Sequence, residues 1–294
     1  MMHFDSPKVE NEQILNFGIA LRDNAAKHGS KPALIVGEQT VTWAEFGAMV
    51  AQVTGQLKAQ GIGQGNTVAS LSENSVEHAV LYCAVVASGA CIVPLPFSAT
   101  PAALALMMSD SNAEFLFASS AQADTARGLA VKHVVDLDEL MTWAADAALA
   151  GPAGGKPDDL FNIIYSSGTT GTPKGIVHDH RFRSRQLQRI TNFGLTEADR
   201  LVISTPIYSN TTLFGMLPTL ALGATLIVMP KFNAAAFVKL SADLKPTHAV
   251  LVPVQFMRLM AEPTFGDHDL TSYRCKFSTS APLPGTLIGQ VMAR

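Results

Sequence analysis

Charged residues, cysteine and unbroken apolar runs are all scarce in this 294-residue sequence. Charged residues make up 15% of it, and 21 Lys and Arg against 24 Asp and Glu give a net charge of −3. Without a basic excess the chain cannot neutralise a run of phosphates, which excludes nucleic acid as its main partner. The three cysteines, Cys83, Cys91 and Cys275, are odd in number and share no metal-ligand spacing. They predict free thiols in a reducing, cytoplasmic compartment and no metal site.

Two apolar stretches, 79–97 and 213–229, are long enough to cross a bilayer, but both are interrupted. The interrupting residues are Gly89, Pro94 and Pro96 in the first stretch and Gly215, Pro218 and Gly223 in the second. Each stretch divides into a helical part, a glycine and a β-rich run, which favours a buried helix followed by a buried strand. The polar, mildly acidic N-terminal segment is not a signal peptide. We therefore expect no integral membrane segment.

Apolar residues make up 48% of the sequence, enough for a large core, and they alternate between strand and helix patterns. Ile14 begins a helix to about 28, a hairpin covers 33–42, and Thr42 with Glu45 forms a capping box for the next helix. Strands are predicted at 67–71, 91–95, 114–118, 132–135, 161–165, 200–205, 224–229, 247–252 and 274–277, and helices at 75–88, 100–110, 182–190, 212–222, 234–244 and 253–261. This alternation predicts an α/β fold of mostly parallel, doubly wound sheets.

The segment 165–178, YSSGTTGTPKGIVH, follows a buried apolar strand and precedes a predicted helix. Its glycines allow backbone N–H groups to approach an anion, its hydroxyls add donors, and Lys174 adds a positive charge. This is the chemistry of a polyphosphate-binding loop. The predicted phosphate ligands are Ser166, Ser167, Gly168, Thr169, Thr170, Gly171 and Lys174.

Two other phosphate-binding motifs are excluded by spacing. Counted from Gly168, the second glycine of a Walker A loop would fall on Pro173, and Gly175 stands where that loop needs a hydroxyl for Mg²⁺. The glycines at 61–65 precede a strand instead of following one, so they do not form a dinucleotide-binding fingerprint. They are interpreted as a helix end and turn.

The segment 165–178 closely resembles the phosphate-binding signature of the adenylate-forming superfamily, which includes acyl- and aryl-CoA ligases, peptide-synthetase adenylation domains and beetle luciferases. The resemblance covers nearly the whole chain. It implies two stacked sheets with flanking helices, an αβαβα arrangement, with the active site at their junction. The subdomain 65–190 would carry the phosphate loop, and 14–62 with 195–294 would carry the acyl and adenine segments.

Two further segments carry the resemblance. At 205–212, TPIYSNTT, the family usually has Pro-x-aromatic-His; Tyr208 fits, but Ser209 replaces the histidine, which favours orienting a carboxylate over acid–base chemistry. An ordinary helix N-cap built from Ser209 and Thr211 is the alternative. At 278–283, STSAPL resembles the small-residue adenine segment and implies adenine contacts by Ser280, Ala281 and Pro282. The implied acyl-binding residues are Tyr208, Ser209, Thr211, Phe214 and Val254, although Phe214 and Val254 also suit an apolar core.

The substrate class follows partly from an absence. No Asp or Glu lies between Asp199 and Asp243, so nothing there would pair with the ammonium group of an amino acid. The resemblance therefore implies ATP-dependent activation of a non-amino acid, fatty or aryl, to acyl-AMP, followed by thioester formation, with ATP, Mg²⁺ and CoA as cofactors and co-substrates.

The family's later parts have no counterpart in these residues. The resemblance places the Mg²⁺-binding Glu, the ribose-binding Asp and the C-terminal domain with its adenylation lysine beyond Arg294, so none of the residues present is predicted to be catalytic. The expected identity is thus the N-terminal portion of an acid–CoA ligase, inactive by itself. The alternative is a non-catalytic nucleotide- or acyl-binding protein. An open edge of the second sheet makes a homodimer a candidate assembly.

Two polar clusters receive structural interpretations. His178, Asp179 and His180 alternate on an extended segment without a third ligand, which disfavours a metal site. Arg181, Arg183, Arg185 and Arg189 are interpreted as a solvated helix face, with contact to a CoA phosphate or a partner as the alternative.

Overall fold

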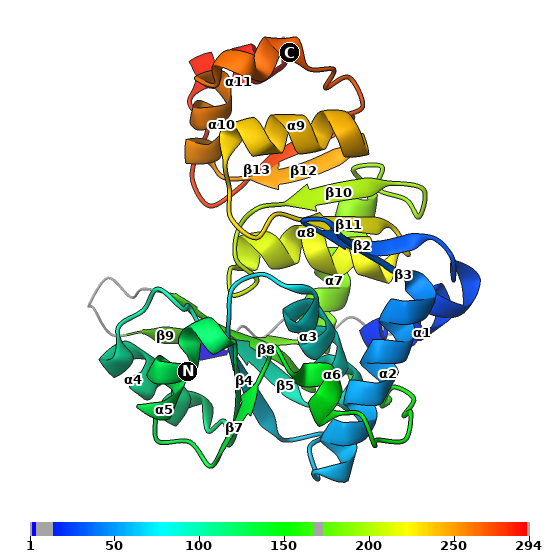
Figure 1. The fold of residues 1–294 in the computed structure, drawn as a ribbon, viewed down its shortest axis with the longest axis vertical. Coiled ribbons are helices and arrows are strands. Elements are labelled where there is room, and N and C mark those ends of the chain that lie inside the picture. The colour runs from blue at the N-terminus through cyan, green and yellow to red at the C-terminus, as the bar shows by residue number, and fades with distance from the viewer. Residues whose placement is uncertain (1, 4–13, 167–172, 293–294) are drawn as a thin grey trace.

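Two twisted sheets stacked on a shared layer of helices form the protein (Figure 1). The computed structural model describes residues 2–3, 14–166 and 173–292. The expected α/β fold with two mostly parallel sheets is confirmed.

The first sheet has seven strands in the order β1-β9-β8-β5-β4-β6-β7, and only the β8–β9 pair among them is antiparallel. In chain order the strands are β1 (Met2–His3), β4 (Thr67–Leu71), β5 (Cys91–Pro94), β6 (Phe115–Ala118), β7 (His133–Asp136), β8 (Leu160–Ser166) and β9 (Lys174–Asp179).

The second sheet has six strands in the order β13-β12-β10-β11-β2-β3, and its antiparallel pair is β2–β3. The strands are β2 (Pro32–Val36), β3 (Gln39–Thr42), β10 (Arg200–Ile203), β11 (Thr225–Val228), β12 (His248–Leu251) and β13 (Cys275–Ser278). The N-terminal hairpin therefore joins strands that lie far later in the sequence, with Leu34 opposite Leu226.

Three apolar clusters separate the layers. The largest lies between the sheets and contains side chains from α1 (Phe17–Lys27), α2 (Trp43–Ala59), α3 (Val76–Ser88), α6 (Leu140–Trp143), α7 (His180–Thr191) and α8 (Asn210–Ala221). The second cluster packs the first sheet against α4 (Pro101–Ser111) and α5 (Ala123–Arg127). The third packs the second sheet against α9 (Ala234–Leu244), α10 (Pro253–Met260) and α11 (Gly285–Met292). Short 3₁₀ helices cover Ser120–Gln122 and Pro263–Asp267. The result is the expected αβαβα layering (Figure 1).

Local sequence signals fix several helix starts. The predicted capping box is present, because the Thr42 side chain accepts the Glu45 N–H while the Glu45 carboxylate accepts the Thr42 N–H. Ser75 caps α3 by accepting the N–H of His78, and α3 ends at Gly89 in the left-handed conformation.

The element after the predicted phosphate loop differs from expectation. We predicted no strand between this loop and the helix at 182–190, but β9 pairs antiparallel with β8, with Ser166 opposite Lys174. The helix α7 then begins at His180, two residues before its predicted start. The reason is that Gly175 and the residues after it have a strand pattern, with Val177 and His178 buried. The predicted phosphate-binding segment therefore connects two strands of a hairpin.

The alanine- and glycine-rich stretch before β8 lies against the middle helix layer. Its backbone is held at two points, where Ala150 N–H donates to Ala51 of α2 and Ala153 N–H donates to Ala87 of α3. Gly55 of α2 permits this close approach, because the Ala148 carbonyl lies where a β-carbon would be.

The loop between β4 and α3 is anchored by a buried histidine. One ring nitrogen of His78, Nδ1, lies 3.0 Å from the Glu73 carbonyl, and Nε2 lies 2.9 Å from the Ser70 hydroxyl. A neutral ring with its proton on Nδ1 satisfies both contacts, because it donates to the carbonyl and accepts from the hydroxyl. Burial lowers the pKa of His78 to about 4.

Cys83 and Cys91 are buried as free thiols, and burial raises the pKa of Cys91 to about 12. No helix in the described part of the chain is both long enough and apolar enough to cross a bilayer.

Replacement of Gly55 by alanine tests the packing of the 144–158 stretch on α2. The new β-carbon would lie 1.9 Å from the Ala148 oxygen, so the backbone of that stretch must move. We expect Gly55→Ala to lower the free energy of unfolding by about 1–3 kcal/mol in urea denaturation. Gly151→Ala is the matched control, since a β-carbon there meets nothing within 4 Å. Equal stability of the two variants would contradict this packing.

The buried neutral His78 predicts loss of stability in mild acid. Its pKa is about 4 in the folded protein against 6.5 in a model side chain, so between these values the unfolded state binds more protons. The free energy of unfolding therefore falls as pH drops below 6.5, by about 2 kcal/mol at pH 5 from this residue. His178, whose pKa is lowered to about 3 chiefly by burial, acts in the same direction. Denaturation of His78→Asn at pH 7.5 and pH 5 should show a clearly smaller difference than the wild type; an undiminished difference would refute the role of His78.

Candidate functional site

The mouth of the β8–β9 hairpin carries two of the predicted phosphate ligands. Ser166 ends β8, Lys174 begins β9, and both side chains are exposed and paired across the hairpin. The other predicted ligands, Ser167, Gly168, Thr169, Thr170 and Gly171, lie outside the described residues. Behind the mouth, the Tyr165 hydroxyl donates to the Asp110 carboxylate at 2.7 Å and lies 3.0 Å from the Met107 carbonyl. Burial, with Asp110 close by, raises the pKa of Tyr165 well above its usual range, so this hydroxyl stays a donor.

The predicted acid-binding segment follows β10 and starts α8. Ser209 occupies the N-cap position, and its hydroxyl accepts the Thr211 N–H at 3.3 Å. Tyr208 contacts Phe97, which follows β5 of the first sheet, edge to face at 5.3 Å between ring centroids. The capping alternative for Ser209 is thus present, and its role in acid binding stays a prediction.

The predicted adenine segment follows β13, and it meets the acid-binding segment directly. The Thr211 and Ser280 hydroxyls lie 2.5 Å apart, and the Thr279 hydroxyl donates to Thr211 at 3.1 Å. Ser280, Ala281 and Pro282 are exposed. Ser280 has φ of 74°, a left-handed conformation that favours glycine. Two segments far apart in the sequence therefore share one hydroxyl cluster.

The chain after the adenine segment continues into α11, and the description stops at Met292. Arg294, the point beyond which the resemblance places the Mg²⁺-binding Glu and the adenylation lysine, lies outside the described residues. The assignment of these two catalytic groups to positions after Arg294 therefore stays a prediction.

Aromatic rings extend from the hydroxyl cluster into the protein. Phe214, one helical turn after Thr211, packs edge to face on Phe277 of β13 at 5.3 Å, and Phe277 packs on Phe193 at 5.2 Å. Phe193 is 55% exposed. By contrast, Val254 lies exposed in the first turn of α10, on the far side of the second sheet from α8. Phe277 and Phe193 were not predicted, because nothing in their local sequence places them beside α8.

Arg183 of α7 is the main polar group that the sequence analysis misjudged. It was predicted on a solvated face, but the side chain is 1% exposed, and Arg181 is also buried and pairs with Asp158 at 2.9 Å. The reason is that α7 packs between the two sheets, so more than one side of the helix is buried, including the positions of Arg181 and Arg183.

The guanidinium of Arg183 joins three elements. It donates to Asn162 of β8 at 2.8 Å and Asn210 of α8 at 2.9 Å, and it lies 3.2 Å from His178 of β9. Burial lowers its pKa to about 10, so it remains charged at neutral pH. Both strands of the hairpin are thereby connected to the first turn of α8.

The His178, Asp179 and His180 side chains each make a separate structural contact. His178 stacks on Phe182, Asp179 caps α7 by accepting the Phe182 N–H at 2.6 Å, and His180 packs on Phe161. Within the described ranges, no three His, Cys, Asp or Glu side chains gather closely enough to hold a metal ion.

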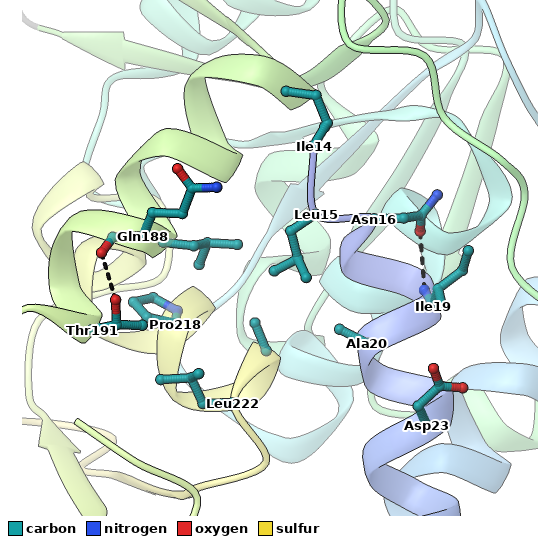
Figure 2. A pocket seen from close by; sticks show the side chains of 12 residues that line it. Ile14, Leu15, Asn16, Ile19, Ala20, Asp23, Gln188, Thr191, Pro218 and Leu222 are labelled. Carbon is teal, nitrogen blue, oxygen red and sulfur yellow. Dashed lines mark hydrogen bonds between the residues drawn. The ribbon is translucent and has the colours of Figure 1, made fainter. Parts of the chain in front are cut away.

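A groove of about 570 Å³ lies at the other end of α8, between α1, α7 and α8 (Figure 2). Its walls include Leu15, Ile19, Pro218 and Leu222. Pro218 is about two helical turns from Thr211, so this groove is separate from the hydroxyl cluster at the start of the helix.

Comparison with known proteins agrees with this arrangement. The family model described as AMP-binding enzyme matches residues 21–294. The long-chain-fatty-acid–CoA ligase FadD13 of Mycobacterium tuberculosis is 30% identical over 288 residues, which cover 93% of this chain and 57% of that protein. The feruloyl-CoA synthase of an Amycolatopsis species is 29% identical over 262 residues, covering 88% and 53% of the two chains. The chain thus spans just over half the length of these relatives.

Solved structures match nearly the whole chain. The crystal structure of the N-terminal domain of FACL13 from Mycobacterium tuberculosis superposes with a TM-score of 0.88 at 26% identity, covering 95% of this chain and 74% of that one. ATP-bound MatB from Rhodopseudomonas palustris gives a TM-score of 0.84 at 27% identity, with coverage of 96% and 58%. Motif, fold and family model agree, and the chain belongs to the AMP-binding enzyme family.

Proposed function

We propose that this chain forms the substrate-binding part of an ATP-dependent acid–CoA ligase that acts on a non-amino carboxylic acid, fatty or aryl. The observation that carries the proposal is the contact between Thr211 and Ser280, because it joins the predicted acid-binding and adenine-binding segments at one point. Residues 65–190 would supply the phosphate-binding half, and 14–62 with 195–294 the acid and adenine half.

The reaction would run in two steps. A carboxylate oxygen attacks the α-phosphorus of ATP, the bond to the β-phosphate oxygen breaks, and acyl-AMP and pyrophosphate form. The CoA sulfur then attacks the acyl carbon, AMP leaves, and the thiol proton is released. Bound Mg²⁺ would neutralise phosphate charge, while Ser166 and Lys174 hold the β- and γ-phosphates and the hydroxyl cluster orients the carboxylate.

The substrate class is inferred from the lining near the cluster. The aromatic rings of Phe214 and Phe277 lie next to the hydroxyl cluster and pack on each other. No acidic residue between Arg200 and Ala242 could pair with an ammonium group. An apolar acyl or aryl group therefore suits the site better than an amino acid. The relatives named above are a long-chain-fatty-acid–CoA ligase and a feruloyl-CoA synthase, so their names are compatible with either an acyl or an aryl acid.

The complete protein would carry the activity, in the cytoplasm, and this segment alone would lack it. Acid-dependent exchange of labelled pyrophosphate into ATP, measured on the protein as isolated from its source, tests the proposal. Exchange requires formation of the adenylate, whereas a protein that only binds nucleotide or acyl groups would show none. The same preparation, sized by its mass in solution, tests the proposed homodimer.

Replacement of Lys174 should affect ATP far more than the acid. Loss of a charge-assisted hydrogen bond to phosphate costs about 1.5–3 kcal/mol, so Lys174→Ala should raise KM for ATP at least about 10-fold. KM for the acid should change less than about 3-fold. Lys132→Ala, before β7 at the opposite edge of the first sheet, is the control. A change confined to the acid would contradict the phosphate assignment.

Truncation of Phe214 should affect KM for the acid and not KM for ATP. Removal of an apolar contact of this size costs about 1.5–3 kcal/mol, so Phe214→Ala should raise KM for the acid about 10-fold or more and leave KM for ATP nearly unchanged. Phe232→Ala removes a half-buried ring on the far face of the second sheet and serves as control. If both variants bind the acid equally well, Phe214 does not line the acyl site.

A further inference from the structure

Asn74 lies in the loop between β4 of the first sheet and α3. Both polar atoms of its side chain bond to backbone groups that follow strands of the second sheet. Its Oδ1 accepts the Ile207 N–H at 2.9 Å, and its Nδ2 donates to the carbonyls of Thr205 at 3.0 Å and Met229 at 3.4 Å. The residue is 6% exposed. A single buried amide thus pairs with three backbone groups, two of them in the segment that carries Tyr208 and Ser209.

The loop that carries Asn74 is attached to the first sheet by several hydrogen bonds. Ser75 caps α3, His78 bonds the Glu73 carbonyl, and the Glu73 carboxylate accepts from the Ser119 hydroxyl at 3.0 Å and the Gln122 amide at 2.9 Å. The residues on both sides of Asn74 are therefore fixed to the first sheet. The backbone at Asn74 therefore cannot move away from the first sheet without breaking these bonds.

The segment on the other side follows β10, buries Ile207 in the main apolar cluster and is bonded to α8. The Thr205 and Thr212 hydroxyls lie 2.7 Å apart, and Thr212 donates to the Pro206 carbonyl at 2.6 Å. Tyr208 rests on Phe97. Asn74 adds three hydrogen bonds from the loop after β4, two of them to this turn.

We propose that Asn74 is a positioning residue for acyl-adenylate formation, acting through Ile207 and the first turn of α8 on the Thr211–Ser280 hydroxyl cluster. This inference rests on the proposed ligase function. The attack on the α-phosphorus requires the carboxylate and the phosphates, held by different sheets, to meet in line, and a misplacement of about 1 Å can cost on the order of 100-fold in rate.

The residue type fits this role. A side-chain amide offers a donor and an acceptor in one plane, so it can pair an N–H and carbonyls at once. Aspartate would keep the bond from Ile207 but would face the Thr205 and Met229 carbonyls without a hydrogen to donate. Alanine would leave all three backbone groups unpaired.

A merely structural hydrogen bond would also destabilise the protein when removed, so the experiment needs a control of the same kind. Asn24 of α1 provides it, because its amide donates to the Leu220 and Ala221 carbonyls at 3.0 and 2.9 Å. These carbonyls lie at the far end of α8 from Thr211. Asn24→Ala therefore removes comparable bonds without touching the turn.

The first measurement is pyrophosphate exchange by the complete protein at saturating ATP and acid. Asn74→Ala should lower kcat about 30- to 100-fold with KM for ATP changed less than about 3-fold, while Asn24→Ala stays within about 2-fold of wild type. Thermal unfolding of both variants identifies a temperature at which they are folded. If Asn74→Ala does not fold, the isosteric Asn74→Asp replaces it, with at least a 10-fold fall expected. A wild-type kcat in the Asn74 variant, or an equal fall in Asn24→Ala, overturns the proposal.

The second measurement does not depend on catalysis. Amide hydrogen exchange at Ile207 should become at least about 10-fold faster in the Asn74 variant and stay unchanged in Asn24→Ala. Unchanged protection at Ile207 overturns the proposal. Absence of exchange activity in the wild type would instead refute the ligase function, so the two failures are distinguishable.

Discussion

The shared helix layer between the two sheets is the constraint on which the site depends. Each sheet buries one face against the same helices, and one apolar cluster runs through both interfaces. Gly215 lets α8 approach the second sheet, since a β-carbon there would lie 2.8 Å from Val250. Because the two sheets pack face to face across these helices, the loops at the carboxyl ends of β4 and β5 contact the loops at the carboxyl ends of β10 and β11. Loops at these ends form the ligand-binding edge of a doubly wound sheet, and here two such edges converge.

Polar links then fix the register between the two halves. Asn74 joins them through backbone groups, and Arg183 joins the hairpin strands to Asn210. The side chains that Arg183 contacts in these bonds are neutral, so none of them cancels its charge as a carboxylate would. A buried cation acts over a longer range than an exposed one, since water screens it less. Its position beside the first turn of α8 therefore adds positive potential near the segment proposed to bind the carboxylate.

The sequence predicted elements whose signals are local. The α3 helix was found from its Ser75 cap and terminal Gly89, and α9 was predicted with its observed bounds. Strand β9 was missed because the glycine-rich loop before it obscured a short strand pattern that only pairing with β8 makes stable. Burial of Arg183 and the contacts of Asn74 could not be predicted, because both depend on which elements pack together across the sheets. For the candidate site, motifs identified the segments, while the links between them needed the fold.

Two positions that differ from the family's usual residues, Ser209 and Ser280, both contribute hydroxyls to the same region of the site. Ser209 stands where a histidine is usual, and Ser280 takes a left-handed φ in a segment where the family often has glycine. Together with Thr211 and Thr279 they place four hydroxyl side chains in adjoining segments, three of them joined by hydrogen bonds. Ser280 keeps this left-handed φ, which costs a non-glycine residue free energy, while its hydroxyl bonds to Thr211. Hydroxyls donate and accept without changing charge near neutral pH. None of these four hydroxyls takes up a proton near neutral pH, which suits the proposed adenylation, because its attacking carboxylate is already ionised.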